Sequence, residues 1–189
     1  MIKIIAGKKK RTSIIVPKNI VRPTTAQKRE AIFSVIESYG LKKNLNIYKN
    51  SIILDLFAGS GILGLEAISR GADFVYFFEK NIEVIKCLKK NCLKICNNNY
   101  IISNEDITKS NFSTINKKIS LIFIDPPYNI NPFKNLFINI KKSKILKKNT
   151  LIIIESSINL KLDCPIFLDC LKVKKYKKTK ITFLINKNI

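Results

Sequence analysis

The tetrapeptide Asp125-Pro126-Pro127-Tyr128 directly follows an apolar run at residues 121–124 and could perform chemistry on a nucleobase. An exocyclic base amine is a weak nucleophile, because its lone pair is delocalised into the ring. If the Asp125 carboxylate and the Pro126 carbonyl each accept one N–H bond, the nitrogen is oriented and its developing positive charge is stabilised. Tyr128 offers an aromatic face for the base. The motif predicts methyl transfer to a base amine, although alone it also fits an ordinary proline-rich turn.

A glycine-rich turn upstream is a candidate cofactor site. Gly59, Gly61 and Gly64 follow an apolar run at residues 51–57 and precede a helical pattern. This GxGxxG arrangement lets a nucleotide approach the backbone at a helix N-terminus. Glu79 lies about twenty residues after the first glycine, where a carboxylate can accept hydrogen bonds from both ribose hydroxyls. These residues fit NAD as well as S-adenosylmethionine.

Two aspartates favour S-adenosylmethionine over NAD. Asp55, inside the strand before the turn, can hold the cationic methionine end directly or through water, whereas it would repel a pyrophosphate. Asp106 follows a later apolar run and can accept a hydrogen bond from the adenine amino group. Taken singly, each aspartate also fits a role as a strand-end cap. The predicted cofactor site comprises Asp55, Phe57, Ala58, Gly59, Ser60, Gly61, Glu79, Lys80, Asp106 and Ile107.

The chain has no histidine, and its five cysteines form no CxxC pair. A Cys/His zinc site is therefore excluded and a thiolate zinc site is disfavoured, so we expect no metal. Cys87, Cys92 and Cys96 fall on an expected helix, where buried thiols are the usual interpretation. The commonest general base is also absent, but methyl transfer from a sulfonium does not require one.

The formal net charge is +22, from 35 Lys and Arg against 13 Asp and Glu, and it favours a polyanionic partner. Only four of the basic residues are arginines, and abundant Lys, Ile and Asn is also typical of an AT-rich genome. A hydrophobic content of 46% indicates a globular protein. Because no run approaches the length of a membrane helix or signal peptide, we expect a cytoplasmic protein without membrane contact.

Hydrophobic periodicity predicts an α/β fold. Five apolar runs of strand length alternate with helical patterns, which indicates a doubly wound, mostly parallel, Rossmann-like sheet. The strands are expected at residues 51–57, 74–78, 100–103, 121–124 and 151–155, and the helices at residues 62–70, 82–95 and 133–146. Two further strands, at residues 171–176 and 180–185, are expected to form an antiparallel C-terminal hairpin, which brings the sheet to seven strands.

The first forty residues follow a different pattern. Apolar runs at residues 2–6 and 13–16 flank the basic stretch 7–11, which predicts a small β-hairpin with a basic tip. Beyond Pro23, Thr24 and Gln27 form a capping-box pattern that begins a helix. We therefore divide the chain into an N-terminal hairpin and helix, residues 1–40, and a cofactor-binding core, residues 41–189.

Along nearly its whole length the chain resembles the bacterial 16S ribosomal RNA guanine-N2 methyltransferases of the RsmD type. The matching segments are residues 4–7 with the basic tip, Arg22-Pro23-Thr24-Thr25, Arg29-Glu30, residues 55–61 and 64–67, Glu79, Asp125-Pro126-Pro127-Tyr128 and Glu155. The Asp-Pro-Pro-Tyr motif is shared with DNA adenine methyltransferases, whereas the hairpin with Arg-Pro-Thr-Thr is more specific. One departure is the tip, which lacks the aromatic residue and the further arginines that the family often has there. The change preserves phosphate binding and removes any stacking by that residue.

The resemblance implies a class I methyltransferase fold, S-adenosylmethionine as the donor, and one guanine of 16S rRNA as the acceptor. It also implies that the substrate is the assembled or partly assembled small ribosomal subunit. We expect the protein to be a monomer. The implied catalytic residues are Asp125, Pro126 and Tyr128. The implied RNA contacts are Lys8, Lys9, Lys10, Arg11, Arg22, Pro23, Thr24 and Pro127.

Three other functions share part of this pattern. A DNA adenine-N6 methyltransferase would need a target-recognition segment, for which 189 residues leave little room. A nicotinamide-dependent oxidoreductase would share the glycines but would leave Asp125-Pro126-Pro127-Tyr128 without a role. A non-catalytic RNA-binding factor of ribosome assembly fits the basic composition, yet it would not need an intact donor site and catalytic motif.

Overall fold

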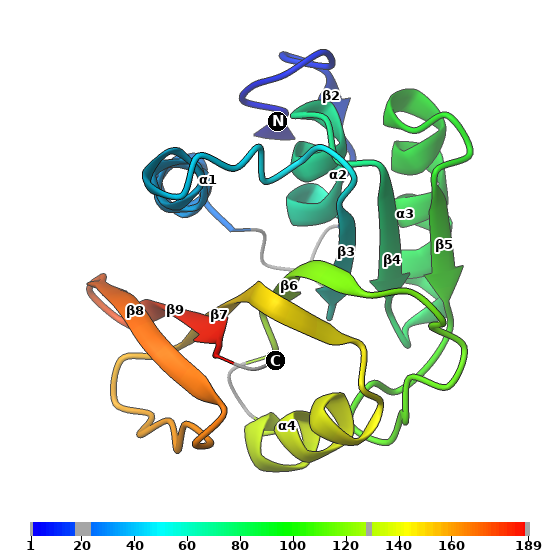
Figure 1. Ribbon diagram of the computed structural model, residues 1–189. Coiled ribbons are helices and arrows are strands. Elements are labelled where there is room, and N and C mark those ends of the chain that lie inside the picture. Colours follow the sequence, from blue (N-terminus) through cyan, green and yellow to red (C-terminus); the bar gives the residue numbers. More distant parts are fainter. Residues whose placement is uncertain (1, 18–23, 128–129, 188–189) are drawn as a thin grey trace.

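A seven-stranded sheet forms the middle layer of the computed structural model, which describes residues 2–17, 24–127 and 130–187 (Figure 1). The strand order is β5-β4-β3-β6-β7-β9-β8. Neighbours from β5 to β7 are parallel, whereas β9 is antiparallel to both β7 and β8. The strands are β3 Ile52–Leu56, β4 Phe74–Phe78, β5 Tyr100–Ser103, β6 Ile119–Ile124, β7 Leu146–Ser157, β8 Leu168–Lys175 and β9 Thr179–Asn186. The expected α/β sheet with its C-terminal hairpin is confirmed.

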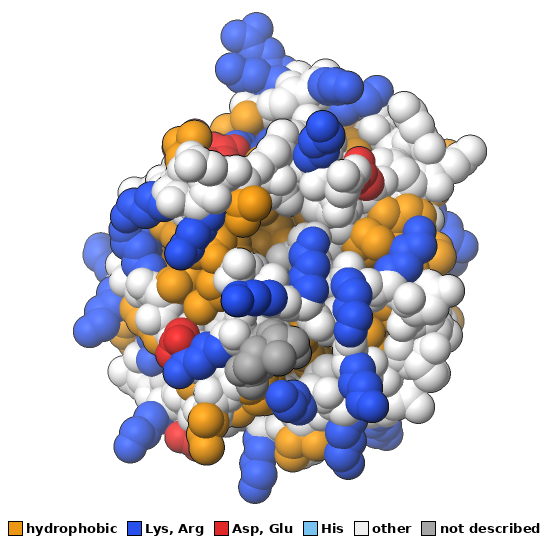
Figure 2. All heavy atoms as spheres, in the orientation of Figure 1, with side chains coloured by type: hydrophobic (Ala, Val, Ile, Leu, Met, Phe, Trp, Pro, Cys, Tyr) orange, Lys and Arg blue, Asp and Glu red, His pale blue; other side chains and the backbone are white. Residues whose placement is uncertain are grey.

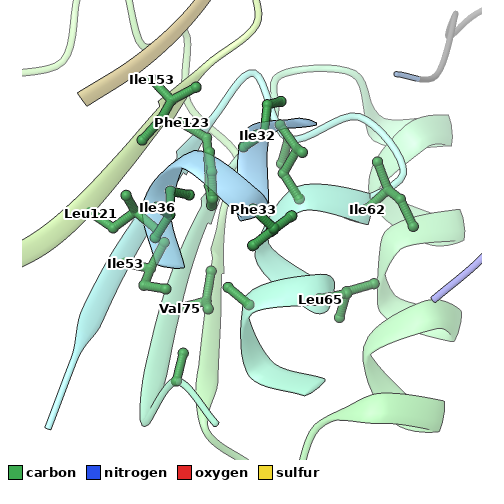
Figure 3. Packing of buried hydrophobic residues seen from close by; sticks show 14 of the residues in the cluster. Ile32, Phe33, Ile36, Ile53, Ile62, Leu65, Val75, Leu121, Phe123 and Ile153 are labelled. Carbon is green, nitrogen blue, oxygen red and sulfur yellow. The ribbon is translucent and has the colours of Figure 1, made fainter. Parts of the chain in front are cut away.

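Helices cover both faces of the sheet. They are α1 Ala26–Lys42, α2 Ile62–Ser69, α3 Ile82–Ile95 and α4 Phe133–Lys142. Side chains alternate across each strand, so Leu121 and Phe123 of β6 join the core under α1, α2 and α3, as Figure 3 shows in part. Ile122 and Ile124 of the same strand join the second core under α4. The parallel strands β3, β4 and β6 are almost fully buried, so they need near-continuous apolar residues.

The N-terminal hairpin, β1 Ile2–Lys3 and β2 Ser13–Ile14, packs against α2. The buried Glu66 carboxylate accepts the backbone N–H groups of Ile5 and Ala6 at 2.8 and 2.9 Å. Arg70 pairs with the same carboxylate at 2.9 Å. Ile4 and Phe33 belong to one hydrophobic cluster with residues of β3, β4 and β6. The described residues of segment 1–40 therefore share the core of the remaining chain.

Two expected boundaries were wrong. Thr25, and not Thr24, caps α1, because its side chain accepts the N–H of Lys28 while the Thr24 hydroxyl bonds elsewhere. The helix expected over residues 133–146 ends at Lys142, and Lys144 adopts a positive φ of 55° that a helix does not tolerate. Leu146 already belongs to β7. The mixed Lys and Ile pattern does not distinguish the last helical turn from the start of a strand.

Candidate active site

The glycine-rich turn lies between the end of β3 and the start of α2. Its backbone takes positive φ values at Phe57, Gly59 and Gly61, of 66°, 55° and 80°. The Ala58 N–H donates to the carbonyl of Phe78 at 2.9 Å, which fixes the turn to the end of β4. A Cβ at Gly61 would come within 2.3 Å of Leu88 Cδ1, so this conformation requires glycine. The turn presents its backbone at the N-terminus of α2, which suits a nucleotide ligand.

Asp55 lies under this turn at the end of β3. Its Oδ2 accepts the N–H of Gly64 at 2.9 Å, and the residue is only 2% exposed. Burial raises the pKa of Asp55 to about 8, the Gly64 hydrogen bond opposes that rise, and the charges of Asp125 and Glu79 add to it. A buried carboxylate with a raised pKa gains most from a cation placed beside it.

Glu79 follows β4 directly and faces the same turn. Its Oε2 accepts the N–H of Gly59 at 3.0 Å, and its Oε1 accepts the N–H of Asn81 at 2.9 Å. These two bonds hold the carboxylate in one orientation. Each carboxylate oxygen has a second lone pair, so the group can still accept hydrogen bonds from ligand hydroxyls.

Asp106 lies beyond the end of β5, which is separated by β4 from the strand that carries Asp55. Its Oδ1 accepts the Oγ1–H and the N–H of Thr108 at 2.7 and 3.1 Å, and its Oδ2 lies 3.4 Å from Lys80 Nζ. The Thr108 hydroxyl and, more weakly, Lys80 keep the pKa of Asp106 below its ordinary value. Lys80 is exposed, whereas Ile107 is buried in the second core.

Ser60 provides an independent sign that the turn accommodates a ligand. Its side-chain oxygen is buried and has no hydrogen-bond partner among the described residues. Its carbonyl accepts Asn91 Nδ2 at 3.0 Å, and the same amide also bonds to Ile15. Asn91 was not predicted as a site residue, since an asparagine in a helical pattern carries no distinguishing signal. The turn, the unpartnered hydroxyl and the three carboxylates together fit S-adenosylmethionine.

Asp125 follows β6, the strand beside β3 in the sheet. Its Oδ2 accepts the Thr24 hydroxyl at 3.0 Å, a contact between residues about one hundred positions apart. The buried Arg29 guanidinium fixes Thr24, because it donates to the Thr24 carbonyl at 2.7 Å and to the Lys3 carbonyl at 3.0 Å. Pro126 is buried and Pro127 is exposed. The predicted site residues Tyr128, Arg22 and Pro23 lie outside the described residues.

Lys28 and Glu155 complete this end of the site. Their side chains form an ion pair between α1 and the end of β7, and Lys28 Nζ also lies 5.6 Å from the centre of the Tyr176 ring. Burial and the charge of Glu155 raise the pKa of Asp125, while the Thr24 hydrogen bond and Lys28 oppose the rise. Glu155 entered the sequence analysis only as a matching residue, and Lys28 not at all. The available signal for Lys28 was its position in the first turn of the helix that begins beside Thr24.

The basic tip is not brought to this edge of the sheet. The backbone N–H of Lys8 donates to the Ser69 carbonyl at 2.7 Å, and that of Lys9 donates to the Ser69 hydroxyl at 3.0 Å. Ser69 ends α2, which runs back from the glycine-rich turn toward the start of the parallel strands. The tip, with Lys10 and Arg11, therefore lies at the opposite end of the sheet from Asp125 (Figure 1).

The carboxyl ends of β3, β4 and β6 thus carry two sets of groups side by side. Asp55, Glu79 and the glycine-rich turn lie together at this edge, and Asp125 stands at the end of the neighbouring strand. This is the edge at which open α/β sheets bind ligands. Among the described residues, no group of three or more His, Cys, Asp or Glu is arranged to hold a metal ion. In the same part of the chain, no helix is long and apolar enough to cross a membrane.

Comparisons with known proteins agree with this architecture. The family model described as Conserved hypothetical protein 95 matches residues 2–185. A ribosomal RNA small subunit methyltransferase D from Buchnera aphidicola subsp. Acyrthosiphon pisum is 41% identical over 145 residues, covering 73% of this chain and 69% of the relative. A protein of the same name from Buchnera aphidicola subsp. Baizongia pistaciae is 35% identical over 195 residues, covering 99% and 93%.

Solved structures share this fold. The Escherichia coli protein yhhF, described as a candidate methyltransferase, has a TM-score of 0.83 and 26% identity, covering 100% of this chain and 99% of that one. An RNA methyltransferase from Salinibacter ruber, solved with S-adenosyl-L-homocysteine, has a TM-score of 0.63 and 12% identity, covering 89% and 95%. The second likeness is one of fold alone.

Proposed function

The chain belongs to the family described as Conserved hypothetical protein 95, and on that premise we propose that it methylates the exocyclic N2 amine of a guanine in 16S rRNA, with S-adenosylmethionine as donor. The observation that carries the proposal is the placement of Asp125, held by Thr24, beside the glycine-rich turn and its carboxylates. Relatives named ribosomal RNA small subunit methyltransferase D support ribosomal RNA as the acceptor.

S-adenosylmethionine, when bound, supplies an electrophilic methyl group on a sulfonium. In this proposal Glu79 accepts hydrogen bonds from the ribose hydroxyls, and Asp106 accepts one from the adenine amino group. Asp55 supplies a negative charge for the methionine end, directly or through water. Phe57, Ala58 and Ile107 line the apolar parts of the site, and the backbone from Gly59 to Gly61 closes around the nucleoside.

The acceptor amine is oriented by the Asp125 carboxylate and the Pro126 carbonyl, with Tyr128 against the base plane. Its nitrogen forms the new bond to the methyl carbon as the carbon–sulfur bond breaks. The positive charge that develops on nitrogen is stabilised by Asp125. The surplus proton then leaves to Asp125 or to water, so the chemistry requires no histidine.

Several finer features belong to the same proposal. We assign the N-terminal segment, residues 1–40, to contact with RNA and to the border of the base pocket. The substrate is the assembled or partly assembled small subunit, the enzyme is a monomer, and it acts in the cytoplasm. Arg22, Pro23, Thr24 and Pro127 would contact the RNA around the target base.

The decisive experiment is methylation of small ribosomal subunits from cells that lack this protein, followed by mass mapping of their 16S rRNA. Purified protein with radiolabelled S-adenosylmethionine should restore one N2-methylguanine. Asp125→Ala should lower the methylation rate at least a hundredfold while donor affinity, measured by calorimetry, changes little. Glu79→Ala should instead weaken donor binding, because the hydroxyls of the bound ribose lose their acceptor. Methyl transfer to DNA adenine, or none to rRNA, would contradict the proposal.

A further inference from the structure

A groove of about 570 Å³ lies between α4 and residues 158–167, and we call it the α4 groove. Its floor and walls are largely apolar. Phe133 and Phe137 lie in one wall with ring centres 6.4 Å apart, and Phe167 faces them from the other segment. Phe167 is half-buried, so part of its ring remains accessible.

The rim of the groove is strongly basic. Four exposed lysines line it, namely Lys134, Lys141, Lys142 and Lys161, against Asp163 as the single lining acid. Within the described part of the chain, none of the four forms an ion pair. Lys141 Nζ lies 4.8 Å from the centre of the Phe167 ring, so a cation and an aromatic face are offered together.

The groove begins at the edge of the sheet formed by the carboxyl ends of the parallel strands, where Asp125 lies. We call this the catalytic edge. The N-terminus of α4 comes shortly after β6, which ends next to Asp125, and residues 158–167 directly follow β7, which carries Glu155. Because β6 and β7 are parallel neighbours, both walls start from the same edge. Figure 2 shows Lys and Arg side chains around exposed apolar side chains in the lower half of the molecule, where α4 lies in Figure 1.

We propose that the α4 groove binds unpaired nucleotides of the RNA substrate that flank the methylated base. Lysines at the rim would neutralise backbone phosphates, and Phe167 would stack on a base. Positive charge that follows a backbone, combined with an accessible aromatic face, is how single-stranded nucleic acid is bound without sequence selection. The inference rests on the proposed function for the identity of the substrate. It assigns RNA binding to a groove that starts at the Asp125 edge of the sheet, where α4 begins. The groove extends to the opposite edge, where Lys141 and Phe167 lie close to the starts of β7 and β8.

A charge-matched pair of variants tests the lysines. The groove variant carries Lys134→Gln, Lys141→Gln, Lys142→Gln and Lys161→Gln. The control variant carries Lys42→Gln, Lys43→Gln, Lys89→Gln and Lys90→Gln, which remove the same charge from exposed positions on α1, α3 and the α1 C-cap. Affinity for a fluorescent single-stranded RNA of mixed sequence is measured as a function of salt. Each lost phosphate contact should lower the slope of log affinity against log salt by about 0.7. The groove variant should therefore lose about 3 from the slope, and the control much less.

A second variant tests whether the aromatic ring of Phe167 stacks on a base. Phe167→Leu keeps an apolar side chain in the wall, so the fold is retained, but it removes the aromatic face. RNA affinity should fall about tenfold, as for the loss of one stacked base. RNA containing 5-bromouridine should cross-link to the peptide that contains Phe167 in the wild-type protein.

Measurements of donor affinity, kcat and KM distinguish this inference from the proposed function. Donor affinity and kcat on small subunits should stay near wild type in the groove variants, while KM for the subunit rises. If wild type methylates 16S rRNA but groove and control variants share one salt slope and one KM, the inference fails and the function stands. A larger loss of RNA affinity in the control variant than in the groove variant also overturns the inference. So do cross-links that form only outside the peptide containing Phe167. Absence of methylation by wild type would instead contradict the proposed function.

Discussion

Three carboxylates lie at the catalytic edge, and each accepts hydrogen bonds from a different neighbour. Asp55 is bound by a backbone N–H, Glu79 by two, and Asp125 by the Thr24 hydroxyl. Because an ionised carboxylate only accepts hydrogen bonds, the protonation state of Asp125 decides whether it can orient an amine. Neighbours that shift the pKa of Asp125 should therefore also change the pH dependence of the methylation rate.

Removing the Thr24 hydroxyl should make the methylation rate more sensitive to acid. The Thr24 hydrogen bond favours the ionised form of Asp125, so Thr24→Val should raise the pKa of that carboxyl. The acid limb of the kcat profile should move to higher pH, and kcat below the limb should fall about tenfold, as expected for one hydrogen bond to a charged group. The pH profile of kcat measures this directly.

Thr25→Val is the matched control, because Thr25 caps α1 and does not contact Asp125. That variant should lose about 1 kcal/mol of stability with the acid limb unchanged. A limb that stays in place in Thr24→Val would show that this hydroxyl does not tune the reacting carboxylate.

Asp55 should make the donor-free protein less stable as the pH rises. Its pKa is about 8 in the folded state against an ordinary value of 3.8, so between these values the folded protein binds a proton that the unfolded chain has lost. The free energy of unfolding therefore falls with pH across this window. Asp55→Asn, which keeps an acceptor for Gly64, should raise the melting temperature at pH values above about 8 and change it little near pH 4.

The same substitution should weaken donor binding, because the cationic end of S-adenosylmethionine loses its negative partner. Asp73→Asn removes an exposed carboxylate and serves as the comparison. If the melting temperatures of wild type and Asp55→Asn have the same pH dependence, the pKa of Asp55 is not raised in the folded protein.

At the scale of elements, short connections bring the chemistry together. The turn between β3 and α2 and the segment after β6 both leave the carboxyl edge of the sheet, while α1 begins at the same edge with Thr25 as its cap. The hairpin tip, in contrast, contacts the end of α2 at the opposite edge. The start of α1 and the hairpin tip both belong to the N-terminal segment, yet they lie at opposite edges of the sheet.

The basic tip should contribute to affinity for a large RNA and not to the chemical step. Changing Lys8, Lys9, Lys10 and Arg11 to Gln should weaken binding to small subunits and lower its salt slope by up to about 3, since four phosphate contacts are removed. The kcat should not change, because the tip lies away from Asp125. Filter binding at several salt concentrations tests this. An unchanged slope would mean that these charges reflect composition alone.

At the scale of the whole molecule, the N-terminal segment and the sheet form one core. Glu66 joins the hairpin to α2 through two backbone N–H groups and Arg70, and Phe33 of α1 packs against Phe123 of β6 with ring centres 5.8 Å apart. A core shared in this way predicts that residues 1–40 do not unfold separately from the remainder.

Glu66→Ala should lower stability by about 3 kcal/mol or more, because Arg70 and two N–H groups lose a buried partner. Thermal unfolding followed by circular dichroism should remain a single transition at a lower temperature. Glu83→Ala, which removes an exposed carboxylate paired with Lys86, should change stability by less than about 1 kcal/mol. Two separate transitions in either protein would contradict the shared core.

The sequence by itself determined the α/β sheet, the cofactor turn and the position of the Asp-Pro-Pro segment. These features rest on local patterns, since parallel strands are apolar on both faces and a turn of positive φ at Gly59 and Gly61 requires glycine. The end of α4 and the cap of α1 were misplaced by local patterns, because several neighbouring residues satisfy the same propensity.

Only the tertiary structure decided which distant residues meet. Thr24 reaches Asp125, Lys28 reaches Glu155, and residues 158–167 face α4, yet no local pattern encodes these pairs. They follow from strand order and helix placement, because β6 and β7 lie side by side and α1, which packs on one face of the sheet, begins at their carboxyl ends. The direction of α2 likewise separated the basic tip from the catalytic edge, and packing of residues 158–167 against α4 placed four lysines around the groove that Phe167 lines. Charge and motif predict what a residue can bind, whereas packing determines which groups it acts with.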